Sequence, residues 1–301
     1  LMAESNVVME ITEKAVTRRR AGLLDAVDDA RRKTARIALD DIGIDPASLA
    51  AMPLINPDVI KLDRTIIQST SPGSQVVNAV LDDARGRGAQ IVAEGVERPE
   101  HLDVARALGA TFAQGWLFGH PGPLPRDIRP SEQTLARVGP RPVARATPYD
   151  VLALTETVDP TTATQLGAMS AGIEEQATHA TGPAILVVNI GDLRHLTDDS
   201  PITYAYLTSR GIEVFLIGHG VPFTPGGRVR GIPLAADDPL RDERTTLLVG
   251  CHFGSGVFAR QRQGPTGKDN AAFDAGTCHE WDRVVEATLP LVSRVKNELV
   301  P

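Results

Sequence analysis

Apolar and polar positions alternate along the first 120 or so residues in a pattern that predicts repeated strand and helix pairs. Short apolar runs, which we expect to be strands, occupy residues 7–11, 36–40, 59–62, 90–93 and 112–118. Amphipathic stretches between them, at residues 19–33, 48–52, 75–87 and 100–108, are expected helices. Gly88 and Gly109 follow two of these stretches and suit helix ends. Strands that alternate with helices indicate βαβ units and a parallel sheet.

The carboxyl ends of these predicted strands are rich in charged and polar residues, namely Glu10, Asp40, Asp41, Lys61, Asp63, Glu94 and Gln114. In a parallel α/β barrel such ends converge on one face, where catalytic residues lie. Any one acid at a strand end is more often a turn or helix cap than a ligand. A whole set at consecutive strand ends is different, because clustered carboxylates repel one another unless cations lie between them. The set therefore favours a two-metal site.

Five motifs in this region occur in a fixed order. They are Val8-Met9-Glu10-Ile11-Thr12-Glu13, Ala38-Leu39-Asp40-Asp41-Ile42-Gly43, Ile60-Lys61-Leu62-Asp63, Ala93-Glu94-Gly95-Val96-Glu97 and Gln114-Gly115-Trp116-Leu117-Phe118-Gly119-His120-Pro121. This series resembles the motifs of EAL-type cyclic di-GMP phosphodiesterases over roughly residues 1 to 125. The resemblance implies a TIM-type (β/α) barrel that hydrolyses one phosphodiester bond of cyclic di-GMP with Mg or Mn.

The resemblance also implies roles for single residues. Glu10, Asp40, Asp41 and Glu94 would hold the metals, and Asp63 would support them. Lys61 would position the attacking water, so Lys61 and Glu94 are the expected catalytic residues. Gln114 would line the nucleotide pocket, and Glu13 would anchor the loop after Asp41. A homodimer is expected as well.

The sequence departs from the family pattern in two places. The Glu-Ala-Leu segment and an Asn-bearing strand that belong before residue 1 are absent from these 301 residues, and five strands are visible where a barrel has eight. We therefore expect an incomplete barrel, a gene product that extends upstream, and a 301-residue chain that is inactive by itself. The loop after the paired aspartates reads Ile42-Gly43-Ile44-Asp45-Pro46-Ala47-Ser48 instead of Phe-Gly-Thr-Gly-Tyr-Ser-Ser.

A second region of different character follows. Residues 121–148 are rich in Pro and Arg and predict a semi-rigid connector. We expect domains at residues 1–127 and 149–301, with the linker at 128–148. In the second domain, helices are predicted at residues 162–178, 204–209 and 281–295 and strands at 184–189, 213–217, 246–253 and 256–261, the last two joined through Gly254-Ser255. This pattern predicts a mixed α/β fold.

The composition of the chain limits the functions that it can have. The net charge of -7 makes it a poor general binder of nucleic acid. Two cysteines, Cys251 and Cys278, make no disulfide framework and favour a reducing, cytoplasmic setting. No apolar run is long enough for a membrane span.

Cys251-His252, Cys278-His279 and His219 lack the spacing of a zinc site. The segment 264–269 lacks the spacing of a phosphate loop, and we interpret it as an exposed turn.

The second region resembles the DICT sensory domain from Leu152 to Leu289. The matching stretches are residues 185–192, 245–261 and 273–274, and the segment from Trp281 to Val285. The resemblance implies signal input rather than catalysis. We expect a ligand, a small molecule or another signal, in the crevice beyond Gly191-Asp192 and Gly218-His219-Gly220, where open α/β sheets bind ligands.

Three hypotheses for function remain. The first is a cytoplasmic signalling protein whose phosphodiesterase is controlled by the sensory domain. The second is an EAL-like receptor that binds cyclic di-GMP, or only a partner protein, without turnover, and the altered loop after Asp41 favours it. The third is an unrelated metal-dependent barrel enzyme, which five ordered motifs disfavour.

Overall fold

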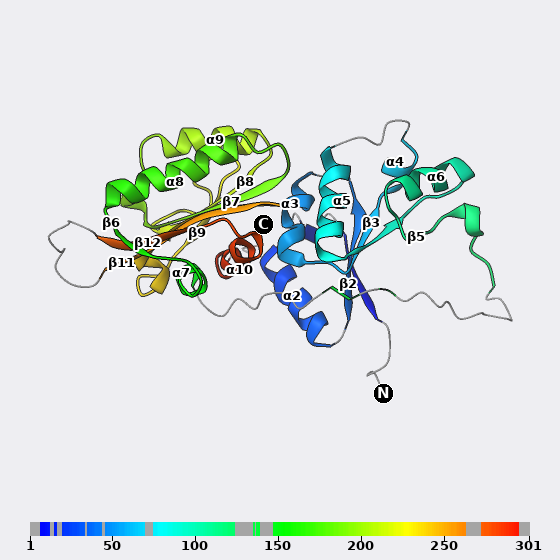
Figure 1. Cartoon of the computed structure of the whole chain (residues 1–301), viewed down its shortest axis with the longest axis horizontal. Coiled ribbons are helices and arrows are strands. Elements are labelled where there is room, and N and C mark those ends of the chain that lie inside the picture. Colours follow the sequence, from blue (N-terminus) through cyan, green and yellow to red (C-terminus); the bar gives the residue numbers. More distant parts are fainter. Residues whose placement is uncertain are drawn as a thin grey trace. The chain divides into compact units, whose positions relative to one another are not determined.

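The computed structural model describes residues 7–12, 15–16, 20–33, 35–43, 46–69, 75–123, 135, 137–138, 147–262 and 272–294. The chain forms two compact units that divide at residues 141 and 142, except that residues 20–22 group with the second unit. Each unit is built around its own sheet (Figure 1). Most of the expected linker, residues 128–148, lies outside the described residues.

The first unit contains a five-stranded sheet in which every neighbouring pair of strands is parallel. The strands follow chain order: β1 (Val8–Thr12), β2 (Arg36–Ile42), β3 (Val59–Leu62), β4 (Gln90–Ala93) and β5 (Phe112–Ala113). The helices between them are α2 (Arg20–Arg32), α3 (Pro46–Ile55), α4 (Arg64–Ile67), α5 (Gln75–Arg87) and α6 (Pro99–Ala107). The predicted parallel α/β arrangement is therefore confirmed, with five strands in an open order among the described residues.

The two faces of this sheet differ in burial, because successive strand residues point to opposite faces. On one face the residues are fully or almost fully buried, namely Ile37, Leu39, Ile60, Leu62, Ile91 and Ala93. Buried residues of the helices, such as Val27, Met52 and Val80, complete this core. On the other face Val8, Arg36, Gln90, Val92 and Phe112 are only half-buried, whereas Ala38, Val59 and Lys61 are buried.

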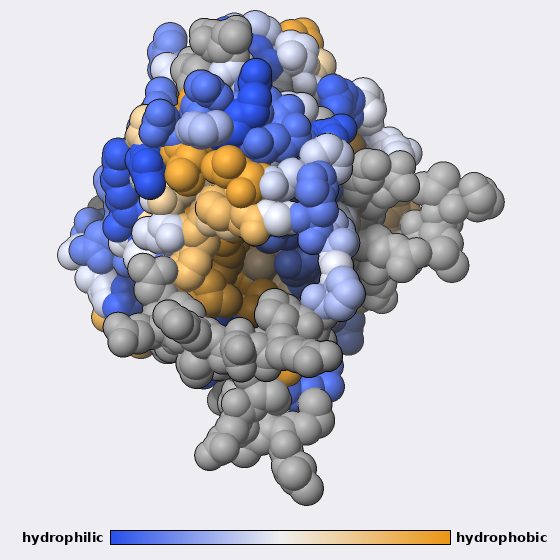
Figure 2. Space-filling view, turned by 90° about the vertical axis from the view of Figure 1, so that its right-hand side faces the viewer, coloured by the Kyte–Doolittle hydropathy of each residue, from blue (hydrophilic) through white to orange (hydrophobic). Residues whose placement is uncertain are grey.

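One side of the first unit has hydrophobic character. Figure 2 looks onto the side of the first unit that carries β5 and α6, and shows hydrophobic residues gathered in a hollow with hydrophilic residues around it. Trp116 and Phe118, which follow β5, are 60% and 58% exposed.

Element ends agree with the sequence pattern at some points and differ at others. Gly88 and Gly109 both have φ +74 just after α5 and α6, as expected of helix ends. The predicted strand at 112–118 is wrong in its second half, because residues 116–118 form a 3-10 turn. Gly115, at φ +153, turns the chain there, and a Cβ at this position would lie 2.2 Å from the carbonyl oxygen of Val96.

The second unit contains a seven-stranded mixed sheet in the order β6-β12-β11-β10-β7-β8-β9. Its strands are β6 (Asp159–Thr161), β7 (Ala184–Asp192), β8 (Glu213–His219), β9 (Arg230–Pro233), β10 (Glu243–Gly250), β11 (Gly254–Gln261) and β12 (Phe273–Cys278). Helices α8 (Ala163–Thr178) and α9 (Ser200–Ser209) cover one face, and α7 (Pro148–Leu152) and α10 (Trp281–Val292) lie on the other (Figure 1). The sequence pattern missed β6, β9 and β12, and placed the β10–β11 turn at 254–255, whereas Gly254 already pairs with Val249.

A buried ion pair fastens α7 to the sheet. Glu243 is fully buried, and its Oε1 lies 2.7 Å from Nη2 of Arg260. Arg260 also contacts Asp150 at 2.6 Å and stacks over the ring of Tyr149 at 4.3 Å. Because these groups satisfy one another, we assign them a structural role.

Candidate functional site

Three strand ends of the first unit bring carboxylates around one amine. The Nζ of Lys61 lies 2.6 Å from Oδ1 of Asp40, 2.8 Å from Oε1 of Glu94 and 3.2 Å from Oε1 of Glu10. Lys61 is only 8% exposed. The parallel register, Thr12 opposite Asp40 and Leu62 opposite Ala93, places these residues at the same edge of the sheet. The structure thus brings together four of the residues that the motifs singled out.

An irregularity in β2 adds a fifth. The β2–β3 register shifts between Leu39 and Ile42, and Asp41 has φ +59. In a regular strand consecutive side chains point to opposite faces, whereas a bulge can re-aim one of them. As a result, one carboxylate oxygen each of Asp40, Asp41 and Glu94 lies within 4.8 Å of the others.

The charges of this cluster depend on one another. Burial by itself would lower the pKa of Lys61, but hydrogen bonds to Asp40, Glu94 and Glu10 raise it above its ordinary value, so the amine stays protonated. Burial raises the pKa of Glu94; Lys61 opposes this rise, while Asp40 and Asp41 add to it. The single positive charge of Lys61 is therefore shared by several carboxylates. Such a cluster favours the binding of a further cation.

A divalent metal ion fits this donor set. Carboxylate oxygens are the ligands that Mg²⁺, Mn²⁺ and Ca²⁺ prefer. Among the described residues, Asp40, Asp41 and Glu94 are the only three acidic, histidine or cysteine side chains whose ligand atoms lie this close together. These three side chains can contribute ligands to one ion, and Glu10 lies beside them in contact with Lys61.

Gln114 lies next to the cluster. Its Nε2 donates a hydrogen bond to Oε1 of Glu94 at 2.9 Å, and the side chain is exposed. An exposed amide beside the acids is suitably placed to contact a ligand that enters from solvent. Gly95 has φ +65 and lies close to Arg64 of α4. A Cβ at position 95 would be 2.4 Å from Cβ of Arg64, so this close approach requires glycine.

Glu13 and Asp63 are the remaining predicted site residues. Glu13 falls outside the described residues. Asp63 caps α4, because its Oδ1 accepts a hydrogen bond from the backbone N–H of Thr65 at 2.7 Å. The sequence alone did not separate a helix cap from a metal-supporting acid at this position.

Replacing Asp63 with Asn separates these two roles. Asn caps helices as well as Asp does. If Asp63 acts only as a cap, Asp63→Asn should leave both the unfolding midpoint and Mn²⁺ affinity of the chain unchanged. Titration of Mn²⁺, followed by electron paramagnetic resonance, measures the affinity. A clear loss of affinity without loss of stability would show that the carboxylate supports the metal.

The two cysteines of the second unit are buried free thiols. Burial, first of all, raises the pKa of Cys278 to about 11. The interpretation of both as small buried residues is consistent with this environment, and segment 264–269 lies outside the described residues.

Two cavities of the second unit lie near the carboxyl end of β7. The first, of about 410 Å³, is lined by residues of α8, β7, α9 and β10. The second, of about 300 Å³, is lined among others by Asp192, Arg241 and Arg244. Neither includes Gly218, His219 or Gly220, which we expected beside Gly191-Asp192. Sequence reasoning missed Glu174, Tyr204 and Arg244 of the first cavity, because no motif links residues so far apart in the chain.

The fold and the acidic cluster define the first unit as a parallel α/β unit with a lysine-centred acidic site of the metal-binding type. Comparison with known proteins agrees. The EAL domain family model matches residues 1–121. Curated relatives include the cyclic di-GMP phosphodiesterase RocR of Pseudomonas aeruginosa, 36% identical over 122 residues, and PdeB of Shewanella oneidensis, 29% identical over 134 residues. The expected resemblance to this family is confirmed for this stretch.

These matches cover a minor part of each protein. They cover 40% of this chain and 31% of RocR, and 44% of this chain and 16% of PdeB. Solved structures with a similar part include the EAL domain of Mycobacterium smegmatis DcpA, 26% identical with a TM-score of 0.33, covering 38% of this chain and 53% of that one. Another is a manganese and cyclic di-GMP complex of Klebsiella pneumoniae BlrP1, 27% identical with a TM-score of 0.35, covering 38% and 30%. Among the helices that the structure describes, none has the length and apolar character of a membrane span.

Proposed function

We propose that residues 1–121 supply the carboxyl-terminal part of an EAL-type barrel site that hydrolyses cyclic di-GMP. The observation that supports this most strongly is the placement of the Lys61 amine among Glu10, Asp40 and Glu94, with Asp41 beside them. The motif match over residues 1–121 and the relatives named as cyclic di-GMP phosphodiesterases support cyclic di-GMP as the proposed substrate. The proposed setting is the cytoplasm, and the proposed assembly is a homodimer.

Each residue has a proposed task. Asp40, Asp41 and Glu94, with Glu10, would hold Mg²⁺ or Mn²⁺, which supplies charge neutralisation and activates water. Lys61 would donate a hydrogen bond that orients the attacking water, and Gln114 would contact the nucleotide. Water's oxygen bonds to phosphorus while one phosphoester P–O bond breaks. One proton of the water ends on the released sugar hydroxyl and the other passes to solvent, which leaves a linear dinucleotide.

The alternative is a receptor without turnover, and one observation favours it. The loop after Asp41 differs from the family pattern, and α3 begins at Pro46, only five residues beyond Asp41. A short loop fixed by proline has less freedom to adapt to a ligand.

Two measurements on the full-length product of the gene separate enzyme from receptor. Calorimetric titration with cyclic di-GMP in Ca²⁺ measures binding, and chromatography of the nucleotides after incubation with Mn²⁺ measures turnover. The enzyme predicts binding and a linear product. Binding without product identifies the receptor, and absence of both contradicts the proposal.

We further propose that the second unit is a sensory domain of the DICT type that controls the first. Its support is the cavity-bearing mixed sheet at the positions of the sequence resemblance, together with a proline-rich connector that can transmit a change in orientation. The proposal predicts that full-length protein and a version ending at residue 129 differ in cyclic di-GMP affinity once cell extract supplies the signal. Equal affinities in every extract would leave the second unit without a sensory role.

A further inference from the structure

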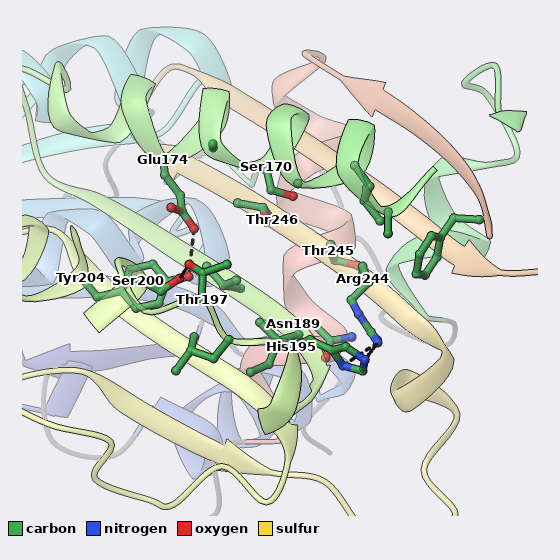
Figure 3. Close-up of a pocket in the computed structure, with 18 residues that line it drawn as sticks. Ser170, Glu174, Asn189, His195, Thr197, Ser200, Tyr204, Arg244, Thr245 and Thr246 are labelled. Atoms are coloured by element: carbon green, nitrogen blue, oxygen red, sulfur yellow. Dashed lines mark hydrogen bonds between the residues drawn. The ribbon is translucent and has the colours of Figure 1, made fainter. Parts of the chain in front are cut away.

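A cleft in the second unit runs along one side of α8. We call it the α8 cleft. Residues of α8 at helical spacing form one wall, and the strands β7 and β10 form the floor (Figure 3). The helix wall consists of Ala163, Leu166, Gly167, Ser170, Ala171 and Glu174. Its volume of about 410 Å³ is in the range of small-molecule sites.

The middle of the α8 cleft is apolar. Val188 and Ile190 of β7 lie on its floor, and Leu166, Leu196 and Phe273 border it. These residues belong to the hydrophobic core of the unit or pack against it, but none of them fills the space between α8 and the sheet. An apolar ligand body would remove this surface from water.

Hydroxyl groups of β10 and α8 line the cleft. Thr246 of β10 is 2% exposed and Ser170 lies opposite on α8 (Figure 3). Thr245 also lines the cleft and is 2% exposed, and its Oγ1 is buried with no hydrogen-bond partner among the residues that the structure describes. Because buried polar groups are almost always paired, an unpaired and almost fully buried hydroxyl at a cavity indicates a missing partner.

One end of the cleft carries a cation with spare donors. The Nη1 of Arg244 donates to the carbonyl oxygens of Arg241 and Glu243, and Nη2 lies 2.9 Å from Nδ1 of His195. A guanidinium has five N–H donors, so two remain. Within the described part of the chain no carboxylate pairs with Arg244, since the nearby Asp192 pairs with Arg194 and Arg241 instead.

The opposite end carries a carboxyl group. The hydroxyl of Tyr204 donates a hydrogen bond to Oε1 of Glu174 at 2.9 Å. Burial raises the pKa of Glu174, and the hydrogen bond from Tyr204 opposes this rise. The cleft therefore runs from a positive end at Arg244, over an apolar middle, to a polar end at Glu174.

We propose that the α8 cleft binds a small amphipathic carboxylic acid. Its carboxylate would accept hydrogen bonds from the two spare donors of Arg244, and its apolar body would lie over Val188 and Ile190. A carboxylate matches this end better than a phosphate dianion, because the single positive charge of Arg244 balances a monoanion and would leave one charge of a dianion unpaired. This proposal adds a class of ligand to the proposed sensory role. Only the biological meaning of binding rests on that role.

The experiment uses the full 301-residue chain and defined probes. Hexanoate, octanoate and 3-phenylpropanoate are titrated calorimetrically at up to millimolar concentration, each beside its uncharged primary amide. We expect at least one acid to bind, to raise the unfolding temperature, and to bind at least about tenfold more tightly than its amide, because charge-assisted pairs are the stronger ones.

Two matched pairs of variants locate the site. A Cβ at Gly167 or at Gly172 meets no atom within 4 Å, and both glycines lie on α8, but only Gly167 lines the α8 cleft. Gly167→Leu should weaken acid binding at least about tenfold, whereas Gly172→Leu should not, although both substitutions favour helix. Arg244→Gln should abolish the preference for acid over amide. Arg194→Gln removes the same charge from an exposed side chain nearby and should keep that preference.

The inference is overturned if no acid binds, if acids and amides bind equally well, or if Gly167→Leu leaves the affinity unchanged. Should Arg244→Gln fail to fold, the Gly167 pair still decides the location and the amide series still decides the charge. The sensory proposal fails separately: a chain that binds the acid through this cleft, while cyclic di-GMP affinity of the full-length protein stays constant, keeps the cleft and removes the control.

Discussion

Asp40→Asn should abolish hydrolysis of cyclic di-GMP by the full-length product of the gene. The carboxylate of Asp40 contacts Lys61 at 2.6 Å and belongs to the only close trio of acids in the described residues. A neutral amide donates N–H groups and cannot replace a carboxylate beside a divalent ion. We expect a loss of more than about 100-fold, since even groups that only orient metal ligands contribute about 10- to 100-fold.

Chromatographic detection of the linear dinucleotide in Mn²⁺ measures this loss. Asp25→Asn serves as the control, because Asp25 is exposed on α2 and changes the net charge equally. Unfolding midpoints of both variants are measured as well, and activity is compared at a temperature where both are folded. Turnover by Asp40→Asn at the parent rate would rule out the acidic cluster as the active site.

Lys61→Met should destabilise the first unit in the absence of metal. Methionine has a similar length but no charge, so the substitution leaves Glu10, Asp40 and Glu94 without their shared cation. Breaking a buried ion pair costs about 3–5 kcal/mol, and we expect about 2–3 kcal/mol here because Glu10 is half-exposed and water screens it. Urea denaturation of the 301-residue chain gives the change in midpoint.

Metal should reverse this particular loss. A divalent cation among the same acids replaces the missing positive charge, so Mn²⁺ should restore the midpoint of Lys61→Met while turnover of the full-length variant stays low. Lys33→Met removes a charge from an exposed position after α2 and should change neither quantity. If Mn²⁺ leaves the Lys61→Met midpoint unaltered, the acids do not form a cation site.

Much of the first unit was predictable because its chemistry is local in sequence. Each residue of the acidic cluster lies within a strand or directly after one, and parallel pairing brings these positions together without further information. The helix-capping bond of Asp63 was not predictable, because an acid after a strand serves equally well as a helix cap or as a support for a metal. Nor was the short β5, since Gly115 bends the chain in the middle of an apolar run.

The second unit shows why sequence patterns find strands more easily than sites. The strands β7, β8, β10 and β11 each contain an apolar run, and all four were expected. However, β10 pairs with β7, more than 50 residues earlier in the chain, and this pairing alone brings Arg244 to the residues of α8 and α9. The three missed strands are short or contain Pro, Gly, Asp and Thr, which weakens their signal.

The dependence of hydrolysis on metal is the most direct test of the proposed metal-dependent phosphodiesterase site. Full-length protein is treated with a chelator, freed of it, and incubated with cyclic di-GMP before and after addition of Mn²⁺. We predict that the chelated protein forms no linear dinucleotide and that this product appears once Mn²⁺ is restored. The reason is that the trio of Asp40, Asp41 and Glu94 would need the ion to act. Equal amounts of product with and without the metal would contradict it.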